Sequence, residues 1–220
     1  MSKVRIAIYG AGYLGQQVWH HLFHYYADTT ELLGFIDDSM EPGLEIVGKK
    51  YTLGSVAKAQ HDKHLGPEAI QLVFAIGYSD MRARRSALDR VLGAGYKLFS
   101  VIHPLAVLEP GAEVGDGCTI LGGTVVDQGV AIGAGSFVDI GVRLGAGTVV
   151  GNNNYLSSGT STGSRVKIGE NCFFGMDCTI TTDVVLGSNL FVNAKSLVAR
   201  NMGDNLKFVE LHKAKQLPIP

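Results

Sequence analysis

The feature that most constrains this chain is a six-residue period that runs without an insertion through residues 106–201. It comprises sixteen hexapeptides, and fourteen of their third positions are aliphatic, a phase too long to arise by chance. The third positions are Leu108, Val114, Ile120, Val126, Ile132, Val138, Leu144, Val150, Leu156, Thr162, Ile168, Phe174, Ile180, Leu186, Val192 and Val198. A short fixed period is typical of a solenoid, in which each repeat packs only against its neighbours.

Each hexapeptide predicts one short strand and one turn. Because side chains alternate along a strand, the small or β-branched first residues point inward with the third. Gly, Asn and Asp crowd positions four to six, where the chain bends at little steric cost. Three such faces close a coil of eighteen residues, so Val126, Leu144, Thr162, Ile180 and Val198 form one column. The prediction is a parallel β-helix of slightly more than five coils, rather than a β-sandwich, whose strands keep no strict phase.

Composition argues against several other classes of protein. A net charge of −1 with interspersed acids and bases implies no nucleic-acid partner. No apolar run is long enough to insert in a membrane, and the chain enters a strand without a signal peptide, so a cytoplasmic protein is expected. The three cysteines fall at inward first positions, which favours core packing over disulfides or metal binding.

The segment before the repeat carries the pattern of a nucleotide-binding βαβ unit. The apolar run Val4–Tyr9 predicts a buried strand, and Gly10, Gly12 and Gly15 follow it as a GxGxxG. These glycines let a phosphate approach the backbone and the helix N-terminus. The next helix has an apolar face that comprises Leu14, Val18, Leu22 and Tyr25. A second strand over residues 32–36 ends on Asp37, whose carboxylate is placed to accept from ribose hydroxyls.

This domain is only half of a doubly wound sheet. Its further strands are expected around residues 69–76 and 97–101, which is too little to hold a whole dinucleotide. A mononucleotide or a nucleotide-linked sugar fits the size better. The alternative is a tight strand–helix turn whose glycines serve packing alone.

Three domains are therefore expected: residues 1–101, Rossmann-like; 102–201, the β-helix; and 202–220, a C-terminal cap or tail. The helix expected at 81–92 carries three arginines, for which a solvated face is favoured over phosphate binding. They are Arg82, Arg84 and Arg85. The tail has a basic cluster made of Lys207, His212, Lys213 and Lys215.

The segments YGAGYLG, GFIDDS, FAIGYSDMRARR and SVIHPLAV, followed by the repeat, resemble bacterial sugar acyltransferases of the sialic acid O-acetyltransferase and bacillosamine N-acetyltransferase type. The resemblance implies a left-handed β-helix trimer that binds acetyl-CoA between neighbouring helices, in surface-glycan biosynthesis. It places the sugar nucleotide at Gly10, Gly12, Tyr13, Gly15, Asp37, Asp38, Ile76 and Gly77. It places acetyl-CoA at Tyr155, Gly163, Ser164, Gly175 and Ala194.

In that family an Asn precedes a His–acid pair by seven residues, and the His is the general base. These places correspond to Asp139 and to Ala146-Gly147, and a second family His corresponds to Tyr155. The chain's histidines are His20, His21, His24, His61, His64, His103 and His212. None lies in the hexapeptides, so the base is replaced by alanine, which also makes a zinc site on the β-helix unexpected.

Several substitutes for the missing base stay open. Asp139 is a poor base unless burial raises its pKa, and Tyr155 either packs or donates to the thioester carbonyl. His24 or His212 would have to come from another subunit. The run Asn152-Asn153-Asn154 is interpreted as a ladder of turn residues.

Three functions follow in order of preference. The first is an acyl-CoA-dependent acyltransferase of a nucleotide-linked amino or deoxy sugar, by direct transfer and without a metal. The second is a sugar-nucleotide-binding or scaffold homologue without the base. The third is a nucleotide-dependent enzyme whose chemistry lies in the N-terminal domain.

Overall fold

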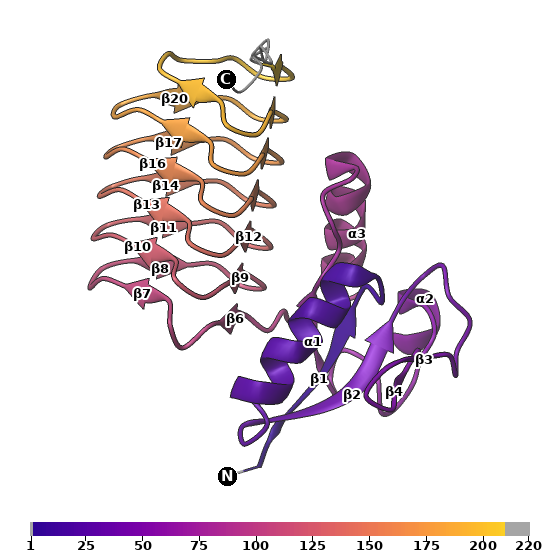
Figure 1. The fold of residues 1–220 in the computed structure, drawn as a ribbon. Coiled ribbons are helices and arrows are strands. Elements are labelled where there is room, and N and C mark those ends of the chain that lie inside the picture. The colour runs from indigo at the N-terminus through magenta and orange to yellow at the C-terminus, as the bar shows by residue number, and fades with distance from the viewer. Residues whose placement is uncertain (1, 210–220) are drawn as a thin grey trace, which may run out of the picture.

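The computed structural model describes residues 2–209 as an N-terminal α/β domain beside a tall solenoid (Figure 1). In the N-terminal domain, β1 (Val4–Tyr9) is the central strand of a parallel sheet. It pairs with β2 (Thr30–Ile36) on one side and β5 (Gln71–Phe74) on the other. The remaining elements are α1 (Tyr13–Tyr25), the hairpin of β3 (Glu45–Val47) and β4 (Lys50–Tyr51), α2 (Val56–Ala59) and α3 (Met81–Gly93).

Two details of this domain differ from the sequence prediction. The strand expected at 97–101 is reduced to one bridge between Leu72 and Leu98, because Val101 pairs with Thr119 of the solenoid instead. Tyr25 is 48% exposed, so it lies outside the buried face of α1. The sheet is therefore a three-stranded half-Rossmann unit that merges directly into the first coil.

The solenoid has three faces, each a parallel sheet. The first face has seven strands: β6 (Val101–Ile102), β9 (Thr119–Ile120), β12 (Phe137–Val138), β15 (Tyr155–Leu156), β18 (Phe173–Phe174), β21 (Phe191–Val192) and β23 (Lys207–Phe208). The second has six: β7 (Val107–Leu108), β10 (Val125–Val126), β13 (Arg143–Leu144), β16 (Ser161–Thr162), β19 (Thr179–Ile180) and β22 (Leu197–Val198). The third has five: β8 (Glu113–Val114), β11 (Ala131–Ile132), β14 (Val149–Val150), β17 (Lys167–Ile168) and β20 (Val185–Leu186).

The expected architecture, a half-Rossmann domain followed by a hexapeptide β-helix, is confirmed. The register of the second face aligns Val126, Leu144, Thr162, Ile180 and Val198, as the period predicts. The solenoid makes about six turns rather than slightly more than five, because β6 and β23 extend the first face at both ends. All three cysteines are buried and unpaired inside it.

The corners of the coil are named by the faces that they join. The first corner leads from the first to the second face, the second corner from the second to the third, and the third corner back to the first. Fifteen of the sixteen hexapeptides end on a residue with positive φ, such as Gly135, Gly147 or Asn171. The period thus fixes the backbone of each turn as well as the core.

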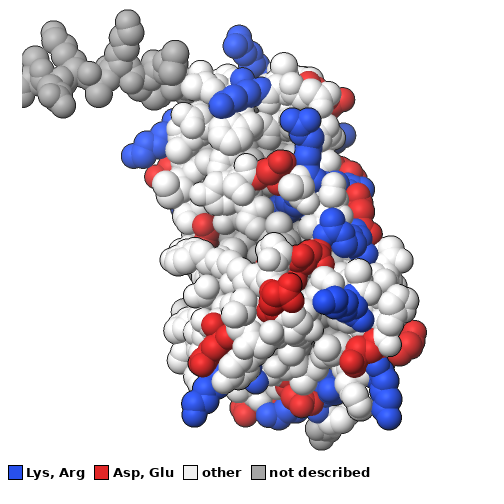
Figure 2. Space-filling model, turned by 90° about the vertical axis from the view of Figure 1, so that its right-hand side faces the viewer, with Lys and Arg blue, Asp and Glu red and all other residues white. Residues whose placement is uncertain are grey.

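The N-terminal domain packs on the lower part of the first face. Outward residues of that face share one buried cluster with Leu14 and Val18 of α1. They are Leu121, Phe137, Tyr155 and Phe173. Acidic and basic side chains are interspersed on the face of the molecule that Figure 2 shows. Across residues 2–209, no helix has the length and apolar character needed to cross a bilayer.

Candidate active site

A cavity of about 960 Å³, here called the interdomain cavity, lies between the two domains. The turn after β1, the start of α1 and the loop after β5 form one wall; the first face and first corner form the other. Its lining comprises Gly10, Gly12, Tyr13, Leu14, Gln17, Asp37, Ala75, Ile76, Gly77, Tyr78, Ser79, Asp139, Ile140, Tyr155, Ser157, Ser158, Phe173, Gly175, Met176, Phe191, Asn193 and Ala194. Both expected binding regions therefore meet in one space.

Six of the eight residues predicted for the sugar nucleotide line this cavity, and Gly15 and Asp38 lie outside its lining. A Cβ on Gly15 would lie 1.9 Å from the Gly10 carbonyl oxygen, so this glycine serves helix–strand packing. Asp38 accepts from the Tyr9 hydroxyl at 2.5 Å and pairs with Arg90. Its carboxylate is occupied within the domain.

The other three glycines predicted to bind the sugar nucleotide differ in their surroundings. Gly10 has φ +109°, and a Cβ there would lie 2.6 Å from the Ala75 carbonyl oxygen, so the fold itself requires glycine. Gly12 and Gly77 have no atom within 4 Å of the place of a Cβ, and neither has a left-handed backbone. No contact within residues 2–209 demands glycine at these two positions. What they provide is open backbone at the cavity wall, where a ligand can approach closely.

Asp37 connects the glycine-rich turn to the end of β2. One carboxylate oxygen accepts from Ala11 N at 2.9 Å, and the other accepts from the backbone and hydroxyl of Ser39 at 2.9 and 2.6 Å. Burial opposes ionisation, but the hydrogen bonds from Ser39 and Ala11 outweigh it and lower the pKa of Asp37. Because a carboxylate has about four acceptor positions, one remains for a ribose hydroxyl.

Asp139 and Tyr155 form the solenoid side of the cavity. Asp139 Oδ2 accepts from the Ser158 hydroxyl at 2.7 Å. Tyr155 is 5% exposed and stacks on Phe137, with ring centroids 4.7 Å apart and planes 16° from parallel. Burial first, and then the Asp139 charge, raise the pKa of Tyr155 far above its ordinary value. The phenol therefore stays protonated at neutral pH, so it is a hydrogen-bond donor and not a base.

Ala146 lies elsewhere, at the second corner between β13 and β14, and does not line the cavity. Its carbonyl accepts from Arg165 N at 2.8 Å. The residues predicted for acetyl-CoA divide in the same way. Tyr155, Gly175 and Ala194 line the cavity, whereas Gly163 and Ser164 lie at the second corner, one coil beyond Ala146.

The polar residues that sequence reasoning missed lie mainly on the first corner. Ser157 and Ser158 lie one coil beyond Asp139 and Ile140, so the eighteen-residue period predicts that they share the corner of Asp139, although not that the N-terminal domain covers it. Among the histidines, His24 is exposed and outside the cavity lining, and His212 lies outside the described residues. No group of three metal-ligating side chains is arranged for an ion within residues 2–209.

The expectation of a solvated arginine face is wrong for Arg84. This residue is 1% exposed, and its guanidinium donates to the carbonyls of Ile76 and Gly135 at 2.9 Å and to Asn153 Oδ1. Burial lowers the pKa of Arg84 to about 10, so the side chain remains a cation at neutral pH. Because it holds Ile76, Arg84 fixes the loop that lines the cavity to the third corner of the solenoid.

The repeat and the fold both match known proteins. Residues 128–158 and 165–194 match the hexapeptide repeat of succinyl-transferase. The acetyltransferase domain of PglB from Neisseria gonorrhoeae superposes with a TM-score of 0.81 at 23% identity, covering 92% of this chain and 95% of that one. The chain has the fold of this acetyltransferase domain.

Two further solved structures share it. A variant of perosamine N-acetyltransferase from Caulobacter crescentus, in complex with CoA and GDP-perosamine, gives a TM-score of 0.80 at 21% identity over 94% of this chain and 93% of that one. WeeI from Acinetobacter baumannii gives 0.68 at 17% identity over 94% and 96%. A search of curated sequences returns no significant match.

Proposed function

We propose that the interdomain cavity binds a nucleotide-linked amino or deoxy sugar, and that the protein transfers an acyl group to this sugar from acetyl-CoA or a related thioester. The observation that carries the proposal is the pair Gly12 and Gly77, which line the cavity and have no described atom within 4 Å of the place of a Cβ. Asp37 lines the same cavity and has one acceptor position left, which would bind a ribose hydroxyl. Tyr13, at 86% exposure on the cavity wall, offers a ring for the base.

The solved neighbours support this assignment of ligands. The PglB domain has been crystallised with acetyl coenzyme A, and the perosamine N-acetyltransferase holds CoA together with GDP-perosamine. In both proteins the fold accommodates a CoA thioester or CoA itself. A cavity of about 960 Å³ is at the upper end of small-molecule sites, which suits two co-substrates better than one.

Transfer would be direct. The sugar amine attacks the thioester carbonyl, the carbon–sulfur bond breaks, CoA leaves as a thiol and the nitrogen loses one proton. Tyr155 lines the cavity and its hydroxyl stays protonated, so it would donate to the carbonyl oxygen as negative charge develops there. Asp139 would accept from the acceptor nitrogen or hydroxyl. An amine that is already neutral needs a general base least, and positioning supplies much of the remaining acceleration.

We also propose a homotrimer, because the residues predicted for acetyl-CoA binding and catalysis lie on two different corners of one chain. Ala146, Gly163 and Ser164 cannot line the cavity of their own chain because they lie on a different corner. A neighbour that sets its second corner against the cavity would unite the two halves of the acetyl-CoA site. Ala146→His should then raise kcat/KM for acetylation, and an unchanged value would count against this placement of the site.

A second candidate is a homologue that binds a sugar nucleotide without catalysis. It is favoured by the absence of histidine from the cavity lining within residues 2–209. Two perosamine N-acetyltransferase variants, in which a histidine is replaced by asparagine or alanine, still hold CoA and GDP-perosamine. Ligand binding in this fold therefore does not depend on that histidine.

Calorimetric titration with acetyl-CoA, UDP and GDP separates these candidates. Acetyl-CoA and a nucleotide should both bind in the micromolar range, and transfer to a nucleotide-linked amino sugar should follow. Binding of the nucleotide alone would leave the non-catalytic homologue. Gly12→Val should abolish nucleotide binding without unfolding the chain, because its Cβ meets no protein atom. Gly93→Ala is the matched control, since Gly93 is equally open but lies at the end of α3.

A further inference from the structure

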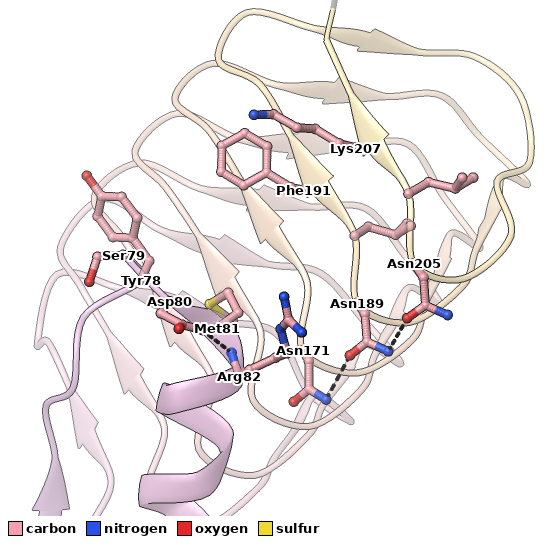
Figure 3. Close-up of a pocket in the computed structure, with 12 residues that line it drawn as sticks. Tyr78, Ser79, Asp80, Met81, Arg82, Asn171, Asn189, Phe191, Asn205 and Lys207 are labelled. Carbon is pink, nitrogen blue, oxygen red and sulfur yellow. Dashed lines mark hydrogen bonds between the residues drawn. The ribbon is translucent and has the colours of Figure 1, made fainter.

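A second cavity, of about 620 Å³, lies between the first turn of α3 and the third corner of the solenoid (Figure 3). We call it the asparagine groove, after Asn171, Asn189 and Asn205, which line it one above another. Tyr78 lines both this groove and the interdomain cavity. Nothing in the proposed acyl transfer uses the groove.

A directed chain of hydrogen bonds runs into this groove from the interior. Arg84 donates to Asn153 Oδ1. Asn153 Nδ2 then donates to Asn171 Oδ1 at 2.9 Å, Asn171 Nδ2 to Asn189 Oδ1 at 3.2 Å, and Asn189 Nδ2 to Asn205 Oδ1 at 3.0 Å. Because a guanidinium can only donate, Asn153 must turn its oxygen to Arg84, and every later amide is thereby fixed in direction.

This direction matters at the end of the chain. Asn205 lines the groove and receives a hydrogen bond on its oxygen, so its NH₂ group is left as a donor. Each bond in such a chain polarises the next, and the first donor is a buried cation, so the whole chain points its positive end at the groove. Within residues 2–209 no acceptor hydrogen-bonds to Asn205 Nδ2.

Two cations also line the groove. Arg82 comes from the first turn of α3 and Lys207 from β23, so they approach the groove from the two domains. Neither forms an ion pair with an acidic side chain in the part of the chain that the structure describes; Lys207 Nζ instead lies 4.8 Å from the centre of the Phe191 ring. Among residues 2–209, the one carboxylate in the lining is Asp80, which caps α3 by accepting from Arg82 N and Ala83 N.

We propose that the asparagine groove is a second binding site, which takes a phosphorylated small molecule. Phosphate oxygens would accept from Arg82, Lys207 and the Asn205 amide, which are all donors. The volume suits a phosphorylated metabolite rather than a lone ion, and Phe191 and Leu206 provide an apolar wall for its carbon part. Because Tyr78 belongs to both cavities, occupancy of the groove would be felt at the interdomain cavity.

The test is calorimetric titration of the full chain with inorganic pyrophosphate at physiological salt. The double variant Arg82→Gln/Lys207→Gln should weaken binding about a hundredfold, at roughly tenfold for each charge-assisted contact. Asn205→Asp is the sharper change, because it still accepts from Asn189 but replaces the terminal donor with an anionic oxygen. It should weaken binding about tenfold or more by the same reasoning.

Arg143→Gln/Lys167→Gln is the matched control, since it removes two exposed cations from the second and third faces and changes the net charge equally. It should leave the affinity unchanged. Equal weakening by both double variants would mean nonspecific attraction and would overturn the proposal, as would no detectable binding. Gly12→Val distinguishes the two cavities. If pyrophosphate binding is lost in Gly12→Val and kept in Arg82→Gln/Lys207→Gln, the binding site is the interdomain cavity. That result would overturn the proposal of a site in the asparagine groove and leave the proposed function standing.

Discussion

The lower and upper halves of the third corner have the same backbone but different residues. Gly117 and Gly135 turn the lower coils with φ +70° and +66°, and Asn171 and Asn189 turn the upper coils with φ +59°. This left-handed conformation costs an ordinary L-residue about 1–2 kcal/mol, and glycine almost nothing. On backbone grounds alone, glycine would therefore serve in every coil.

The N-terminal domain explains the change. A Cβ on Gly117 would lie 2.6 Å from Leu98, and one on Gly135 would lie 2.7 Å from Leu88. Higher up, a groove separates α3 from the corner, and asparagines there gain ladder hydrogen bonds that offset the strain. Asn153 marks the boundary, because it starts the ladder and also meets the buried Arg84. The repeat thus specifies the turn, and the neighbouring domain determines which residue can occupy it.

Arg84→Met should be the most damaging change at this boundary. It leaves three buried acceptors without a donor, namely the carbonyls of Ile76 and Gly135 and the oxygen of Asn153. At about 1 kcal/mol or more for each orphaned group, we expect a loss of about 3 kcal/mol in the free energy of unfolding, measured in urea. Arg82→Met, on the exposed side of the same helix, should change it by less than about 0.5 kcal/mol. Equal losses would show that burial of Arg84 carries no energetic weight.

Gly135→Ala tests the lower half of the corner directly. The change adds the cost of a positive φ to a contact of 2.7 Å with Leu88, and we expect about 2–3 kcal/mol of destabilisation. Gly141→Ala is the control, because Gly141 has φ +70° but no atom within 4 Å of the Cβ, so it carries only the backbone cost. Repeating Gly135→Ala in a Leu88→Ala background should remove the difference. If it persists, the neighbouring domain is not the reason for glycine here.

Asn189 tests the upper half, where two substitutions should differ from each other. Asn189→Ala loses the ladder bonds to Asn171 and Asn205 and keeps the strained φ, which should cost about 1–2 kcal/mol in thermal or urea unfolding. Asn189→Gly loses the same bonds but relieves the strain, so the net change should stay within about 0.5 kcal/mol. If the two variants lost the same free energy of unfolding, the positive φ would carry no cost in the upper half of the third corner, and the contrast with the lower half would not hold.

The same distinction explains what the sequence could predict. Thr162 was assigned to its core column although it is polar, because its surroundings are copies of the repeat eighteen residues away. Arg84 was assigned to a solvated face because its helix looks exposed by itself; its partners Gly135 and Asn153 lie 51 and 69 residues further along the chain. Contacts between unlike elements have no period, and they bury Arg84 and occupy Asp38.

The candidate site divides along the same line. The glycine-rich turn and Asp37 belong to a local motif, so the sequence places them together, and both line the N-terminal wall of the cavity. Ser157 and Ser158 belong to the cavity only because the N-terminal domain covers the first corner at that height. The period places Asp139 and Ala146 in successive hexapeptides and therefore on different corners; what it does not specify is which corner the N-terminal domain covers.

The first corner meets the N-terminal domain through histidine rings instead of glycine alone. His21 of α1 packs edge-on against His103, with ring centroids 5.3 Å apart, and its Nδ1 is buried without a hydrogen-bond partner. Burial, followed by repulsion from His103, His20 and His24, lowers the pKa of His21 below its ordinary 6.5; the charge of Asp139 acts in the opposite direction. The folded protein therefore keeps this ring neutral more readily than the unfolded chain does.

The free energy of unfolding should consequently depend on pH through His21, and this is the smallest effect of the four predictions made here for stability. The unfolded chain binds the proton on His21 more tightly than the folded protein does. The contribution of the neutral ring to the free energy of unfolding is therefore complete above about pH 6.5, and it is lost as the pH falls through the lowered pKa of the folded state. Urea midpoints of the wild type should thus drop between pH 7 and pH 5 by more than those of His21→Gln. His61→Gln, an exposed control after α2, should keep the wild-type slope. If His21→Gln kept the wild-type slope, protonation of His21 would not be the source of the pH dependence, and the contact between α1 and the first corner would not depend on the charge of this ring.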